Sequence, residues 1–116
     1  MLSSYSAPIW LYPKPIDFRR QIDGLVILIA DQLELNPGSG QLFLFRNKGA
    51  NKIKMLWWDR NGFCLLYKRL ERGKLIFPSR QENVMELTRD QLSWLLSGLD
   101  YQLHTLLPEI KAINFF

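Results

Sequence analysis

The stretch KIKMLWWDRNGFCLLYKRLE, residues 52–71, decides the fold, because it reads as two β-strands joined by a tight turn. Both runs are rich in aromatic and branched apolar residues, and Asn61-Gly62 between them is the strongest short signal for a β-hairpin. A turn made of Asn61 and Gly62 needs positive φ at both residues, so Gly62 is expected to resist substitution. The same turn would place Lys54 directly opposite Arg69, which is unfavourable unless an anion lies between the two cations.

A helix is predicted on each side of the strand region. Apolar residues at helical spacing run from Phe18 to Leu33, with Asp17 in position to cap the start. Thr88 and Gln91 have the spacing of a capping box and precede a run of leucines at helical spacing. We therefore expect an N-terminal and a C-terminal helix.

Other short apolar runs complete the predicted sheet. Strands are predicted at residues 42–45 and 75–77, and a short edge strand is expected between prolines at residues 9–12. The order of these elements predicts an α+β fold in which an antiparallel three- to four-stranded meander packs against the two helices. The length of 116 residues is that of one domain, so residues 1–116 are taken as a single unit.

The composition excludes several classes of protein. Apolar residues make up 47% and charged residues 22% of the chain, which is the balance of a globular domain and not of a disordered one. The single cysteine, Cys64, can form neither an internal disulfide nor a cysteine-based metal site. The longest apolar run, residues 24–30, is much shorter than a membrane-spanning helix, and the first residues lack the pattern of a signal peptide. We expect a reduced, cytoplasmic protein with no membrane contact and no cofactor.

Positive charge is concentrated in the middle of the chain. The formal net charge is +4, but residues 46–80 contain ten basic and two acidic side chains, so the rest of the chain is net acidic. Clustered Lys and Arg side chains supply the phosphate contacts that dominate nucleic-acid affinity, and aromatic rings can stack on bases. The alternative is a solvated sheet face whose lysines keep other strands away. The candidate nucleic-acid-binding residues are Arg46, Lys48, Lys52, Lys54, Trp58, Tyr67, Lys68, Arg69, Arg72 and Lys74.

No pattern in the sequence predicts a catalytic or metal site. The lone histidine, His104, has no cysteine or second histidine nearby, and Gly38-Ser39-Gly40 lacks the Lys-Ser/Thr of a phosphate-binding loop. The acidic residues have ordinary explanations in helix termini and turns, without the convergence that two-metal chemistry needs. We therefore expect the protein not to be an enzyme.

The central block resembles a known family. Residues 41–48, QLFLFRNK, and residues 52–74, KIKMLWWDRNGFCLLYKRLERGK, are similar to the signature of the small accessory protein of insertion sequence 66 transposons, the product of the second reading frame, labelled TnpB. Supporting blocks are DFRRQIDGL at 17–25 and LTRDQLSWLLSGLD at 87–100. The resemblance implies a role in DNA transposition beside a separate, larger transposase that cuts and joins strands, and it implies no catalytic residue.

Two functions are compatible with these observations. The first is a non-enzymatic accessory protein that binds the DNA of transposon ends through the basic hairpin region, residues 46–74. The second is an adaptor that docks on the transposase or on another accessory protein of the element, with or without forming a homo-oligomer. The resemblance extends over about residues 9–101 and leaves a C-terminal tail at 102–116, which is apolar where the family often ends in a basic tail. The candidate partner-binding residues in this tail are Ile113, Phe115 and Phe116.

Overall fold

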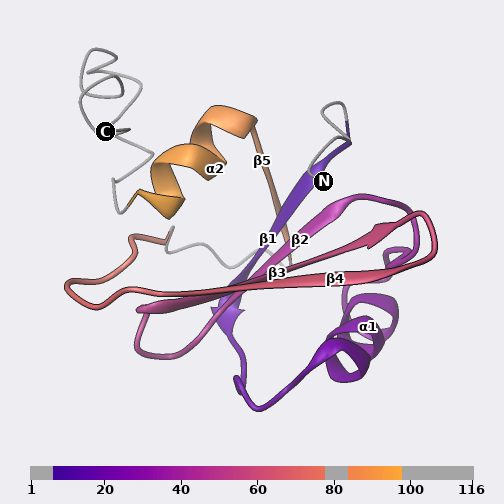
Figure 1. The fold of residues 1–116 in the computed structure, drawn as a ribbon, viewed down its shortest axis with the longest axis horizontal. Coiled ribbons are helices and arrows are strands. Elements are labelled where there is room, and N and C mark those ends of the chain that lie inside the picture. The colour runs from indigo at the N-terminus through magenta and orange to yellow at the C-terminus, as the bar shows by residue number, and fades with distance from the viewer. Residues whose placement is uncertain (1–6, 78–83, 98–116) are drawn as a thin grey trace.

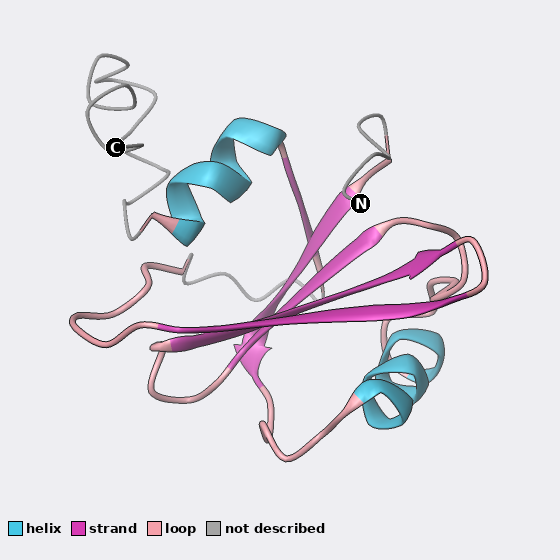
Figure 2. Ribbon diagram, in the orientation of Figure 1, coloured by secondary structure: helices cyan, strands magenta, loops and turns pink. Residues whose placement is uncertain are grey.

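The computed structural model describes residues 7–77 and 84–97, which form a five-stranded sheet with one helix on each face (Figure 1). Figure 2 shows the two helices on opposite sides of the crossed strands. No helix within these ranges is long and apolar enough to cross a membrane. In chain order the elements are β1 (Ile9–Pro15), α1 (Ile22–Asp31), β2 (Leu42–Arg46), β3 (Lys52–Asp59), β4 (Gly62–Arg69), β5 (Met85–Leu87) and α2 (Arg89–Leu96).

The sheet is mixed, with the strand order β4-β3-β2-β1-β5. β1 pairs parallel with β2, whereas the β1–β5, β2–β3 and β3–β4 pairs are antiparallel. Neighbouring parallel strands cannot be joined by a tight turn, and α1 provides the crossover from β1 to β2. The α+β class is therefore confirmed, but the predicted antiparallel meander describes only β2, β3 and β4.

Two short segments differ from their predicted roles. Residues 9–12 belong to β1, which lies inside the sheet between β2 and β5 and not at an edge. Residues 75–77 do not form a strand. Leu75 is instead buried in the core beneath α2, and its N–H donates to the carbonyl of Ala50. The apolar pattern correctly indicates burial at residues 9–12 and at Leu75, although Ile76 is exposed. It does not determine which neighbour each segment pairs with.

Strand β1 accommodates its prolines because Arg46 supplies hydrogen bonds in the irregular part of the ladder. The register with β2 is regular over the first three residues of β1 and shifts before Pro15, which pairs with Arg46. In the irregular part, Nε of Arg46 donates to the carbonyl of Pro13 at 2.7 Å. The N–H of Ile16 then donates to the backbone carbonyl of Arg46 at 2.9 Å. Arg46 therefore holds the end of β1 in the sheet through its backbone and its side chain.

Alternating strand positions build two separate cores, one beneath each helix. The core beneath α2 includes Leu44 and Trp57 from the sheet and Leu95 from the helix. The core beneath α1 includes Phe43 and Phe45 from β2, with Leu25, Leu28 and Ile29 from the helix. Because both faces of the sheet are covered, β2 reads as an uninterrupted apolar run and not as an alternation of apolar and polar residues.

The two helices begin in different ways. At the start of α2 the predicted capping box is confirmed: the N–H of Gln91 donates to Oγ1 of Thr88 at 3.0 Å, and the N–H of Thr88 donates to Oε1 of Gln91 at 2.8 Å. Helix α1 begins only at Ile22, and its N-cap residue makes no side-chain cap bond. The prediction that Asp17 caps this helix is wrong, because the Asp17 carboxylate instead pairs with Arg19 at 2.6 Å.

The β3–β4 hairpin differs in register from the prediction, although its side chains face the predicted sides of the sheet. Lys54 pairs with Tyr67 and not with Arg69, so each residue of β3 meets a partner two positions earlier in β4 than expected. A shift of two residues preserves the face of every side chain, because side chains alternate with a period of two. The expected juxtaposition of Lys54 and Arg69 is therefore wrong.

The turn explains this change of register. Asp59 pairs with Gly62, so the two loop residues are Arg60 and Asn61. The positive φ falls on Arg60, at +58°, and the N–H of Asn61 donates to the carbonyl of Asp59 at 2.6 Å. Gly62 does not have positive φ and lies within the strand, with no atom within 4 Å of the position that a Cβ would take. The prediction that Gly62 lies in the turn with positive φ is therefore wrong.

We expect Arg60→Gly to stabilise the protein by up to about 1 kcal/mol, since the left-handed region costs a residue with a Cβ about 1–2 kcal/mol and part of the gain is lost to glycine's entropy. Gly62→Val is expected to stay within about 0.5 kcal/mol of the wild type, because it adds a strand-forming side chain in open space. Urea denaturation of the two variants checks both values. A large loss of stability in Gly62→Val, with no gain in Arg60→Gly, would contradict this turn and support one made of Asn61 and Gly62.

Candidate nucleic-acid interface

The structure divides the candidate cations into two groups. The side chains of three of them donate to backbone carbonyls of distant residues, and the other five gather at one end of the sheet. The three internal ones are Arg46, Lys54 and Lys68.

Lys54 lies inside the protein and not on an exposed face. It is 1% exposed, and its ammonium donates to the carbonyls of Phe18 and Arg20 at 2.8 and 2.6 Å. The ring centres of Phe18 and Tyr67 lie 5.0 and 5.7 Å from the same nitrogen. Burial lowers the pKa of this ammonium, and the nearby Asp17 opposes the shift. Lys54 therefore ties the segment between β1 and α1 to the sheet, which corrects its expected position on a phosphate-binding surface.

Arg46 and Lys68 have comparable structural roles. Besides its bond to the Pro13 carbonyl, the Arg46 guanidinium lies 5.1 Å from the centre of the Phe77 ring, and its burial lowers its pKa. The Lys68 ammonium donates to the carbonyl of Leu96, the last residue of α2. Carbonyls at this end of a helix lack helical partners, and the helix dipole favours a cation there. Both side chains are half-buried and engaged with the chain itself.

The remaining cations lie at one end of the sheet, where two segments that are distant in sequence are joined by backbone hydrogen bonds. The N–H of Leu70 donates to the carbonyl of Asn51 at 2.7 Å, and the N–H of Leu75 donates to the carbonyl of Ala50 at 2.6 Å. These bonds hold the β2–β3 turn beside the segment that follows β4 (Figure 1). We call the group of cations gathered here the basic rim: Lys48, Lys52, Arg69, Arg72 and Lys74.

The turn that carries Lys48 has a defined conformation. Oδ1 of Asn47 accepts from the N–H groups of Asn51 and Lys52 at 3.1 and 3.0 Å, and Nδ2 of Asn47 donates to the Asn51 side chain. Ala50 completes the turn with a φ of +57°. The Asn47 side chain therefore fixes the backbone from which Lys48 and Lys52 project.

The basic rim has little compensating negative charge. Within residues 46–77 the acidic side chains are Asp59, at the hairpin turn, and Glu71, whose carboxylate accepts from Nε of Arg69 at 2.7 Å and raises the pKa of Arg69. An exposed pair of this kind is weak, so a phosphate can compete with Glu71 for the guanidinium. Lys14 is exposed at the same end of the sheet, beside the Pro15–Arg46 pair. The sequence analysis did not include Lys14 among the candidate residues, because it lies far from the basic segment in sequence. The parallel pairing of β1 with β2 places it at this end of the sheet.

The two candidate aromatic residues lie at different places. Trp58 lies next to the hairpin turn at the far end of β3, where its ring packs edge-on against Phe63 with centroids 5.0 Å apart. Tyr67 is 51% exposed and packs edge-on against Phe18, with centroids 6.0 Å apart. Tyr67 is two positions from Arg69 in β4, so it is the candidate ring that adjoins the basic rim.

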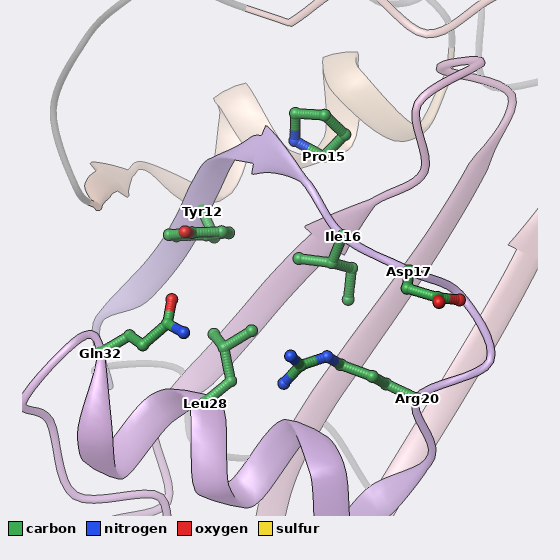
Figure 3. A pocket seen from close by; sticks show the side chains of 7 residues that line it. All are labelled: Tyr12, Pro15, Ile16, Asp17, Arg20, Leu28 and Gln32. Carbon is green, nitrogen blue, oxygen red and sulfur yellow. The ribbon is translucent and has the colours of Figure 1, made fainter.

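A pocket of about 200 Å³ lies between the end of β1 and helix α1 (Figure 3). The Arg20 side chain extends between Ile16 and Leu28 in this pocket. Its one carboxylate belongs to Asp17, and the hydrogen bond from Arg19 lowers the pKa of Asp17 to about 2. A carboxyl group that is ionised at all ordinary pH values cannot act as a general acid there. Within residues 7–77 and 84–97, no three acidic, histidine or cysteine side chains form a group that could hold a metal ion.

These features define a small α+β protein with a cationic surface at one end of its sheet. Residues 7–105 match the family described as IS66 Orf2 like protein, and the chain belongs to that family. Two uncharacterized proteins of Sinorhizobium fredii are similar to it. The protein y4hO is 35% identical over 86% of this chain and 87% of its own length, and y4jC is 37% identical over 80% of each. No solved structure matches the chain.

Proposed function

We propose that the protein is a non-enzymatic accessory factor of IS66 transposition that binds nucleic acid through the basic rim. Membership of the IS66 Orf2-like family supports the role in transposition. The observation that carries the binding proposal is the pair of hydrogen bonds, from Leu70 to Asn51 and from Leu75 to Ala50, that brings two cationic segments together. Phosphate contacts need clustered cations and no particular sequence spacing, and the rim supplies five cations.

The roles of the rim residues follow from their surroundings. Lys48, Arg72 and Lys74 are exposed on the two joined segments and would contact backbone phosphates directly. Arg69 would exchange its bond to Glu71 for a phosphate oxygen. Tyr67 offers an exposed ring beside these cations, on which an unpaired base could stack.

Replacing Lys48, Arg72 and Lys74 together by Ala is expected to weaken nucleic-acid binding and to flatten its dependence on salt. The slope of log affinity against log salt should become less negative by about one for each phosphate contact that is lost. Fluorescence anisotropy with element-end duplex, scrambled duplex and single-stranded DNA, each measured over a salt series, provides the values. The fold should change little, because exposed side chains contribute within about 0.5 kcal/mol of stability.

Arg60→Ala is the matched control for this experiment. Arg60 is also an exposed cation of the basic segment, but it lies at the hairpin turn, at the opposite end of β3 and β4 from the rim. Its removal should leave both affinity and salt slope unchanged. If the triple variant binds with wild-type affinity and salt slope, or if Arg60→Ala loses as much affinity as the triple variant, the rim is not the binding surface.

The adaptor function remains a prediction. Its candidate residues, Ile113, Phe115 and Phe116, lie outside the residues that the structure describes. Co-purification of the transposase with the full chain, but not with a chain that ends at Pro108, would support it.

A further inference from the structure

Strand β4 forms one edge of the sheet and is eight residues long. Figure 1 views the sheet from this edge, with α2 above the strands and α1 below them. The N–H of Leu70 bonds to Asn51 of the neighbouring segment, and the pairing of β3 with β4 is unbroken from that point to Gly62. In an antiparallel pair alternate residues bond to the neighbour, so the even-numbered residues of β4 face β3. The backbone groups of Phe63, Leu65 and Tyr67 therefore point away from the sheet.

Within residues 7–77 and 84–97, most features by which proteins prevent edge-to-edge pairing are missing from this edge. Strand β4 contains no proline, and its register with β3 has no bulge. Its one lysine, Lys68, turns its ammonium toward the end of α2 instead of outward. Two apolar side chains on the strand are exposed, Leu66 at 36% and Tyr67 at 51%. A long edge strand with exposed apolar side chains is a template for another strand. The opposite edge, β5, has only three residues.

We propose that β4 pairs antiparallel with β4 of a second copy of this chain, with Leu65 opposite Leu65 of the second copy. The two five-stranded sheets would then form one continuous sheet of ten strands about a two-fold axis. Phe63 would lie opposite Tyr67 of the second copy on the α1 side, and Cys64 would lie opposite Leu66 on the α2 side. Every outward N–H and C=O group from Phe63 to Tyr67 would gain a partner.

The side chains favour this register over the one with Leu66 at the axis. Residues directly opposite each other in an antiparallel pair share a face, so a symmetric pairing must match odd with odd and even with even positions. With Leu65 at the axis, two apolar cross-strand pairs form on each side of the axis. Phe63 pairs with Tyr67 on one face of the sheet, and Cys64 pairs with Leu66 on the other face. With Leu66 at the axis, Phe63 would face Arg69 and Cys64 would face Lys68. Antiparallel pairing also separates the two basic rims, because each lies at the Arg69 end of its own β4.

A cross-link tests both the surface and the register. In the proposed dimer, residue 64 of each copy lies opposite residue 66 of the other copy. These are positions without mutual hydrogen bonds, where the two Cα atoms lie about 4.5 Å apart, within the range of a disulfide. Leu66→Cys, oxidised with diamide, should therefore form a covalent dimer through native Cys64. The wild type and the double variant Leu66→Cys/Cys64→Ser should not. A covalent dimer of the double variant would overturn the register, because it joins position 66 to itself.

Sedimentation equilibrium tests the association without a cross-link. The wild type should sediment with the mass of two chains, and Leu66→Lys should raise the dimer dissociation constant at least about tenfold, because it brings a cation against the apolar edge. Ile27→Lys is the control, since Ile27 is also an exposed apolar side chain, 57% against 36% for Leu66, but it lies on α1, away from the edge. A monomer at every concentration, or a dimer that Leu66→Lys leaves intact, would overturn the proposal.

Discussion

Replacing Lys54 by Met should lower the free energy of unfolding by about 2–4 kcal/mol. The ammonium donates to the carbonyls of Phe18 and Arg20 in a buried site, and a hydrogen bond to a charged group contributes about 1.5–3 kcal/mol. Met retains the length and apolar stem of Lys but leaves both carbonyls without this donor. Part of the loss is offset, because Met removes the desolvation of a buried charge. Urea denaturation followed by tryptophan fluorescence measures the change.

Lys52→Met is the matched control for Lys54→Met. Lys52 lies two positions earlier on the same face of β3, but it is half-exposed at the start of the strand. Its replacement should change stability by no more than about 0.5 kcal/mol, and any effect should appear in nucleic-acid affinity instead. Equal stability of the two variants, with affinity lost only in Lys54→Met, would return Lys54 to the interface and contradict its structural role.

The second large effect is expected for Arg46→Leu, which should lower the free energy of unfolding by about 2–3 kcal/mol. The variant leaves the Pro13 carbonyl without its donor and removes the contact between the guanidinium and the Phe77 ring. The loss should be concentrated at the end of β1, where the side chain of Arg46 bridges the irregular part of the ladder. Amide hydrogen exchange at Ile16, whose N–H bonds to the backbone of residue 46, should therefore accelerate.

Lys48→Leu is the control for this variant, because Lys48 is an exposed cation just beyond the same strand. It should leave both the urea midpoint and the exchange rate at Ile16 unchanged. If Arg46→Leu preserves stability and the Ile16 rate, the side chain does not hold β1 in the sheet. Arg46 would then be available for phosphate contacts with the basic rim.

The basic segment shows why charge counted along a chain overestimates a binding surface. Arg46, Lys54 and Lys68 are cations like those of the basic rim, yet the side chain of each donates to a backbone carbonyl within the fold. For Lys54 the neighbours in sequence were a usable signal of burial, because it lies between Ile53 and Met55 in a strongly apolar strand. Lys48 and Lys74 instead lie beside glycines in turns, which is typical of exposed sites.

Local rules predicted part of the fold correctly. The capping box at Thr88 depends only on residues within one helical turn, and both of its hydrogen bonds are present. The faces of β3 and β4 followed from alternation, because alternation survives a shift of two residues. The register of the hairpin could not be predicted in this way, because it depends on whether Arg60 or Gly62 adopts positive φ. The preference of Asn-Gly for the turn positions can be overridden by the tertiary context.

The sequence by itself determined the α+β class, the C-terminal helix start, the hairpin and the family, because each depends on periodicity, short-range hydrogen bonding or a contiguous motif. Only the tertiary structure decided that β1 lies inside the sheet beside β2, that Lys54 reaches the carbonyls of Phe18 and Arg20, and that Lys48 and Lys74 lie at one end of the sheet. These features depend on pairings between residues that are distant in the chain. Strand partners, and the carbonyls that a cation reaches, are set when helices and strands pack together, and no local pattern encodes them.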